Sequence, residues 1–161
     1  MATKKINNTV EEVRTPYNKK SKKAYTLAVG RRRSAVARVR LHKTKVLWDG
    51  IEVNLGEIYV NSKPIAEYFQ NEYAKTSFLE ILKSTNTTNK YGFTVKVSGG
   101  GTKGQLNAVL HGVANAMVAL ETDHRPVLKK KGLLTRDSRV RQRRKVGMGG
   151  KSRRKKQSPK R

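Results

Sequence analysis

The chain has 161 residues, of which 37 are Lys or Arg and 11 are Asp or Glu, so its formal net charge at pH 7 is +26. It holds no cysteine, which excludes disulfides and thiolate metal sites, and its 3 histidines are too scattered to form a metal site by themselves. No apolar run approaches the roughly 20 residues that span a bilayer, and the N-terminus lacks a secretory signal. We therefore expect a soluble, cytoplasmic protein with no membrane partner.

The charge is unevenly distributed and divides the chain into three parts. Residues 1–23 hold 7 bases and 2 acids, residues 24–124 hold 13 and 8, and residues 125–161 hold 17 and 1. The middle part is nearly ordinary in composition, whereas the ends are too polar and too cationic to fold alone. We predict a basic N-terminal extension over 1–23 that is disordered away from its partner, a globular RNA-binding body over 24–132 and an extended basic tail over 133–161.

The body begins with two predicted strands, 25–30 and 34–41, separated by the basic cluster 31–33. In the second strand Arg38 and Arg40 alternate with Val39 and Leu41, so one face is basic and the other apolar. Asp49 and Gly50 then form a turn signal between 46–48 and 51–53, which predicts a small hairpin.

The second half of the body alternates strands with helices. The sequence predicts a strand over 58–60, helices over 64–69 and 76–82, and a strand over 91–97. The longest predicted helix covers 105–120, with small residues that permit close packing on a sheet, and a short one covers 126–131. This order predicts the α+β class, as a two-layer α/β sandwich of one sheet and one layer of helices.

A glycine run, Gly99, Gly100 and Gly101 with Gly104, lies between a predicted strand and the longest predicted helix. The run lacks the Gly-Lys-Ser/Thr of a nucleoside-triphosphate loop and the spacing of a dinucleotide fingerprint. Two interpretations stay open: the glycines make only a tight turn, or their backbone amides contact an RNA backbone.

The pattern offers little for catalysis. No paired carboxylates, Ser-His-Asp ordering or metal cluster emerges, so we expect no enzyme activity, no cofactor and no small-molecule substrate. His111 is expected to be a packed or partly exposed histidine, and Tyr25, Tyr59, Tyr68 and Tyr91 to be core or half-buried positions. The basic cluster 31–33, flanked by Arg38 and Arg40, is expected to bind phosphates.

Four stretches together form a recognisable pattern. They are the Gly-Arg-Arg and Ala-Arg-Val sequences within 25–39, Asn61 with Tyr68 and Phe69, the glycine run with Gln105, Ala108 and Gly112, and the basic stretches 134–147 and 158–161. In these residues the chain resembles, over about 24–161, the universal S9 family of small-subunit ribosomal proteins. It departs from the family pattern at Asn115, Met117 and Pro159, and residues 1–23 and the hairpin over 48–55 have no counterpart.

The resemblance implies a two-layer fold like that of the second domain of ribosomal protein S5. It also implies a structural constituent of the small ribosomal subunit, bound to ribosomal RNA in the head beside neighbouring head proteins. The tail would reach the peptidyl site, where Lys160 and Arg161 would contact the anticodon stem-loop of the transfer RNA.

The expected ribosomal-RNA contacts lie in the basic cluster, the strand that follows it, the glycine run and the tail. They are Arg31, Arg32, Arg33, Arg38, Arg40, Gly99, Gly100, Gly101, Lys103, Arg136, Arg139, Arg141, Arg143, Arg144, Lys145, Lys151, Arg153, Arg154, Lys155 and Lys156. Two rival hypotheses are a general nucleic-acid condensing or chaperone protein, which the basic ends alone would support, and an RNA-modifying enzyme, which would need a catalytic group.

Overall fold

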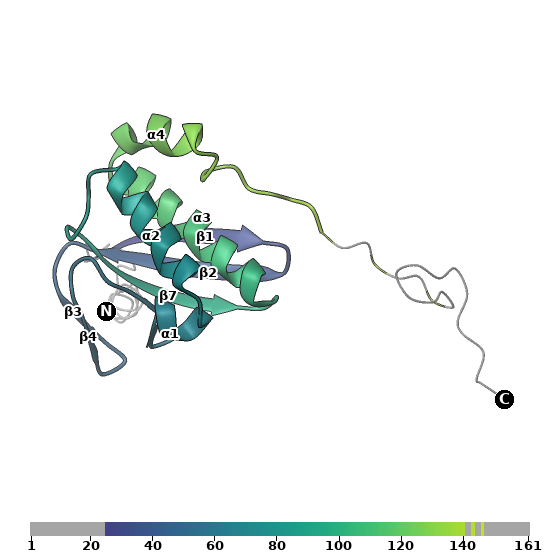
Figure 1. Ribbon diagram of the computed structural model, residues 1–161, viewed down its shortest axis with the longest axis horizontal. Coiled ribbons are helices and arrows are strands. Elements are labelled where there is room, and N and C mark those ends of the chain that lie inside the picture. The colour runs from purple at the N-terminus through teal and green to yellow at the C-terminus, as the bar shows by residue number, and fades with distance from the viewer. Residues whose placement is uncertain (1–24, 141–142, 144–145, 147–161) are drawn as a thin grey trace, which may run out of the picture.

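The computed structural model describes residues 25–140, 143 and 146, and shows one sheet with a layer of helices on a single face (Figure 1). The sheet is formed by β1 (Tyr25–Arg32), β2 (Ala35–His42), β5 (Ile58–Val60), β6 (Lys63–Pro64) and β7 (Gly92–Ser98). The helices are α1 (Ile65–Phe69), α2 (Glu72–Ser84), α3 (Thr102–Leu120) and α4 (Arg125–Lys130), with a single 3₁₀ turn at Thr122–His124.

The strands lie in the order β1-β2-β7-β5-β6. Neighbouring strands are antiparallel except β5 and β7, which are parallel because α1 and α2 connect them. A separate hairpin of β3 (Val46–Trp48) and β4 (Ile51–Val53) follows β2.

Alternation along the strands decides which side chains enter the core. In β2, Val39 and Leu41 are buried toward the helices, while Arg38 is exposed and Arg40 half-buried on the opposite face. Across the sheet, Phe93 of β7 meets Phe78 of α2 edge to face at 5.3 Å between ring centroids. The core therefore lies between the sheet and α1–α3, and the other face of the sheet keeps its polar side chains.

The longest helix, α3, packs unusually close to β1 and β2. A β-carbon at Gly30 of β1 would lie 1.9 Å from the Ala108 carbonyl oxygen, and one at Gly112 of α3 would lie 2.7 Å from a methyl group of Val39. Both distances are too short for any side chain. The small residues along α3 therefore permit close packing, as the sequence predicts.

The predicted two-layer α+β class is confirmed, but several boundaries were wrong. β1 continues through Arg32, so only Arg33 and Ser34 form the turn to β2. Helix α2 begins four residues early, where the Asn71 side chain caps it by accepting from the Tyr73 amide at 2.9 Å. Helix α3 begins at Thr102 and so includes Gly104, and the short β6 and the 3₁₀ turn were not predicted.

Replacing each of the two glycines of α3 by alanine should change the free energy of unfolding in opposite directions. Gly112→Ala forces Val39 or the helix to move, which we expect to lower the free energy of unfolding by about 2 kcal/mol or more. Gly104→Ala places its β-carbon no closer than 3.8 Å to a neighbour and gains helix propensity, worth up to about 1 kcal/mol. Urea unfolding of both variants measures this, and equal effects would contradict the close packing of α3.

Candidate nucleic-acid interface

The turn between β1 and β2 places the three arginines of the basic cluster in different directions. Arg31 is exposed on the open face of the sheet, and Arg33 is exposed in the turn itself. Arg33 adopts a left-handed backbone conformation with φ 54°, which residues other than glycine, asparagine and aspartate rarely occupy. Arg32 points to the helix side, where its side chain is only 16% exposed.

The glycine run lies against this turn. Gly99 and Gly100 both have positive φ, and a β-carbon at Gly99 would lie 2.5 Å from the Ser34 carbonyl oxygen. These two glycines are therefore required by the tight turn. A β-carbon at Gly101 would meet nothing within 4 Å, so the tight turn does not explain Gly101, and Lys103 beside it is exposed.

Side chains from separate elements hold the glycine run in place. The side-chain amide of Gln105 donates to the backbone carbonyl of Gly99 at 3.1 Å. The Tyr68 hydroxyl donates to Oε1 of the same Gln105 side chain at 3.0 Å. Asn61 donates to the Tyr68 oxygen at 3.2 Å and exchanges two hydrogen bonds with the backbone of Val97. Residues from two of the four recognised stretches thus form one network that fixes the end of β7.

The start of the tail is tied to the same end of the body. The Asp137 carboxylate forms an ion pair with the Arg32 guanidinium at 2.8 Å, and it accepts a hydrogen bond from the Arg139 guanidinium at 2.6 Å. Arg32 also donates to the Arg139 carbonyl at 3.2 Å. Leu133 and Leu134 pack against the core before this point, so the chain stays in contact with the body from α4 to Arg139.

Hydrogen bonds from the Arg139 guanidinium, then from its backbone amide, hold the pKa of Asp137 well below its usual range. The charges of Arg139 and Arg32 act in the same direction. Because the folded-state pKa is lowered, the contribution of this carboxylate is complete above the pKa of an unfolded aspartate and is lost as the pH falls below it. The ion pairs of Asp137 with Arg32 and Arg139 are therefore fully formed at neutral pH.

His111 of α3 provides a second tie to the tail. Its Nδ1 accepts from the Arg31 amide at 3.4 Å, and its Nε2 lies 3.3 Å from the Leu134 carbonyl oxygen. The side chain is half-buried. The prediction of a packed or partly exposed histidine is confirmed, and its contacts connect β1 to Leu134 at the start of the tail.

Three segments that lie far apart in the sequence thus meet at one end of the sheet (Figure 1). We call this surface the basic end; it comprises the end of β1 with the β1–β2 turn, the glycine run with Lys103, and the tail anchor at 136–139. Its cations are Arg31, Arg32, Arg33, Lys103, Arg136 and Arg139, and the acid within these segments is Asp137. Such a surface attracts phosphates strongly.

The remaining predicted contacts lie elsewhere. Arg38 and Arg40 lie on the open face of the sheet, away from the glycine run, and Arg143 is exposed. The others fall outside the described residues: Arg141, Arg144, Lys145, Lys151, Arg153, Arg154, Lys155, Lys156, Lys160 and Arg161.

Sequence reasoning missed the anchor. Asp137 is the single acid of the last 37 residues, and this was the available signal, because an isolated acid in a cationic segment is positioned to pair. Nothing in the local pattern indicated its partner Arg32, since 105 positions separate the two residues.

The basic end carries cations and backbone amides, which are groups that bind anions. Over residues 25–140, 143 and 146, no group of three His, Asp or Glu side chains could hold a metal ion. In that same part of the chain, no helix has the length and apolarity to cross a membrane. A one-sided sheet with a cationic end is the arrangement expected of a nucleic-acid-binding protein.

Comparison with known proteins gives the particular family. The family model described as ribosomal protein S9/S16 matches residues 30–161. The small ribosomal subunit protein uS9 of Maridesulfovibrio salexigens is 39% identical over 128 residues, 80% of this chain and 91% of that protein. The uS9 proteins of Anaeromyxobacter sp. (strain K) and Rickettsia bellii are 40% and 38% identical, covering 77% and 85% of this chain, and 88% and 77% of their own lengths.

The chain therefore belongs to the ribosomal protein S9 family. It is a structural constituent of the small ribosomal subunit, takes part in translation and is not an enzyme. As such a constituent it associates with ribosomal RNA and with other ribosomal proteins. Both rival hypotheses, the general condensing protein and the RNA-modifying enzyme, are thereby excluded.

Neutralising the anchor carboxylate is predicted to free the start of the tail. In Asp137→Asn the side chain keeps its shape but loses both ion pairs, so the backbone of 136–139 should become mobile while the body stays folded. Heteronuclear ¹⁵N nuclear Overhauser effects of those amides should fall. Glu80→Gln, which removes the Lys131–Glu80 pair at 3.1 Å, is the matched control and should leave those amides unchanged. Unchanged values in Asp137→Asn would show that the ion pairs do not hold the tail.

Proposed function

We propose that this protein binds ribosomal RNA in the head of the small subunit and that its tail reaches the peptidyl site. There Lys160 and Arg161 would contact the backbone of the transfer RNA anticodon stem-loop. The protein would lie beside other head proteins in a cytoplasmic ribosome. The Arg32–Asp137–Arg139 anchor is the observation that carries the proposal, because it fixes the point from which the tail departs.

The length of the tail is compatible with this role. From Arg139 to Arg161 there are 22 further residues, which could span at most about 75 Å if fully extended. They carry 11 Lys and Arg and no acid, so the segment suits a path among phosphates. The match to the S9/S16 family model continues through Arg161, which supports a role for the final residues within that family.

The basic end would supply the ribosomal-RNA contacts of the body. Its cations come from three segments that the fold holds together, so an RNA backbone can meet several of them at once. Gly101 and the first turn of α3 offer free backbone amides and Lys103 beside that surface. Contacts of this kind go to the backbone and position the RNA without selecting its sequence.

Deleting residues 158–161 tests the tail role. Subunits carrying the deletion should assemble normally, because the body and most of the tail remain, but should retain peptidyl-site transfer RNA less well. Filter binding of deacylated transfer RNA to purified small subunits measures this. Losing the Lys160 and Arg161 contacts should weaken retention several-fold and make it less sensitive to salt.

The matched control removes the same charge from another surface. Lys75→Gln with Lys83→Gln changes two exposed cations of α2, far in the sequence from the tail. Retention should stay at the wild-type level in that variant. Equal retention by the deletion and by the control would refute the tail contact.

A further inference from the structure

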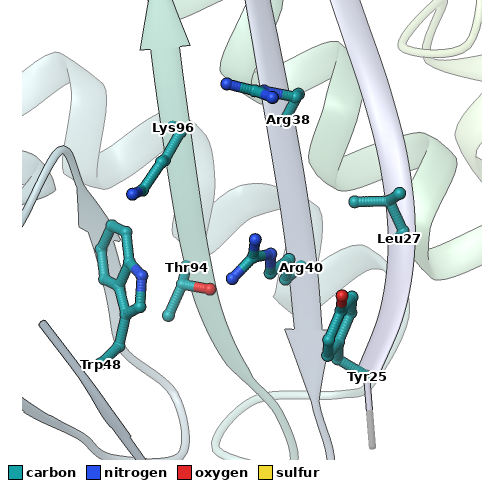
Figure 2. Close-up of a pocket in the computed structure, with 7 residues that line it drawn as sticks. All are labelled: Tyr25, Leu27, Arg38, Arg40, Trp48, Thr94 and Lys96. Atoms are coloured by element: carbon teal, nitrogen blue, oxygen red, sulfur yellow. The ribbon is translucent and has the colours of Figure 1, made fainter. Parts of the chain in front are cut away.

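The face of the sheet opposite the helices carries a pocket that the basic end does not explain. Directly paired positions place Leu27 beside Arg40 and Arg40 beside Thr94, with Arg38 opposite Lys96 one step further along. The β3–β4 hairpin leans over this face and adds Trp48. Together these side chains and Tyr25 line an open pocket of about 290 Å³ (Figure 2).

The cations of the pocket repel one another. Arg38 and Lys96 face each other across β2 and β7, an arrangement that destabilises a sheet when both are charged. Asp49 lies 3.8 Å from Lys96, but both side chains are about half exposed and the carboxylate also accepts from Ser62. One weakly held acid thus faces three cations, and a bound anion would relieve the repulsion.

Aromatic rings keep two of these cations at the pocket. The Arg40 guanidinium lies 5.1 Å from the centroid of the Tyr25 ring, and the Lys96 ammonium lies 5.8 Å from that of Trp48. Figure 2 shows Trp48 and Tyr25 on opposite sides, with Thr94 and Arg40 between them. The pocket therefore combines positive charge with flat surfaces.

The hairpin that supplies Trp48 is firmly seated. Trp48 is 8% exposed and Val53 is 1% exposed, although neither belongs to the main core beneath the helices. A β-carbon at Gly92 of β7 would lie 3.4 Å from a methyl group of Val53. The hairpin thus packs on the sheet itself, and the wall of the pocket is preformed.

We propose that this pocket binds one unpaired nucleotide of RNA, with its phosphate between Arg38 and Lys96 and its base against Arg40, Tyr25 and the edge of Trp48. Unpaired bases stack on aromatic rings and on guanidinium planes, whereas the bases of a duplex are already stacked. The volume lies just below the roughly 300–1,000 Å³ typical of ligand pockets, which suits a ligand as small as a single nucleotide.

Two other occupants fit less well. The N-terminal segment 1–23 carries 7 bases and 2 acids, so its charge opposes that of the pocket. An acidic peptide would match the charge but would leave the two aromatic walls without a role. A nucleotide would contact both aromatic walls. This inference rests on the RNA association of the protein and adds a binding site and a class of ligand to it.

The full-length protein provides its own probe, because Trp48 is its one tryptophan. Trp48 fluorescence is followed while an eight-nucleotide single-stranded RNA or a hairpin duplex with the same number of phosphates is added. Anisotropy of a dye on the RNA reports total binding in the same samples. The single strand should quench Trp48 several-fold more than the duplex when both are bound to the same extent.

Variants of the pocket cations give the matched test. Arg38→Gln with Lys96→Gln relieves the repulsion across the sheet, so it should fold, and it should raise the RNA concentration for half-quenching about tenfold. Lys75→Gln with Lys83→Gln removes the same charge from α2 and should leave that concentration unchanged.

The remaining outcomes separate the proposals. Anisotropy that rises without quenching of Trp48 would overturn the nucleotide pocket and leave RNA association intact. Quenching by polyglutamate as strong as that by the single strand would overturn it in favour of an acidic protein segment. No rise in anisotropy with either RNA would contradict the proposed function itself.

Discussion

The close contact between α3 and β1 is the constraint on which the other features of this structure depend. At Gly30 and Gly112 the helix lies so near the sheet that no β-carbon fits between them. This contact places the N-terminal turn of α3, with the glycine run, beside the β1–β2 turn. It also positions His111 to contact Leu134 at the start of the tail. The helices cover one face of the sheet (Figure 1), and the other face is left open for Arg38, Arg40 and Lys96.

The chain has a net charge of +26 and few acids, so the position of each acid decides which cations are neutralised. Among the described residues, the one acid of the tail is placed where it neutralises two arginines and joins the tail to the body. Each ion pair of this kind is weak when exposed, but the pairing here is supported by a half-buried Arg32 and by the hydrogen bond that the Arg139 amide donates to the Asp137 carboxylate. The other cations of the basic end, Arg31, Arg33, Lys103 and Arg136, stay available to RNA, which supplies the negative charge that the protein lacks.

Local pattern was sufficient to predict the elements whose periodicity is long and regular. The alternation in β2, the presence of β7 and of the long helix α3, and the turn of the β3–β4 hairpin were predicted correctly. The start of α2 was misplaced because Asn71 caps it through a single side-chain contact. At the candidate site, the clustering of positive charge in the sequence indicated the cations of the basic end. The Asp137–Arg32 pair and the pocket with Trp48 could not be predicted, because both depend on strand register and on contacts between distant segments.

The central claim is that body and tail together hold this protein in the small ribosomal subunit through many simultaneous phosphate contacts. Co-sedimentation of the tagged full-length protein with the subunit after a high-salt wash tests it most directly, since salt strips loosely bound polycations. The account predicts stoichiometric retention on the small subunit. Loss of the protein into free or mixed nucleic-acid fractions would contradict it.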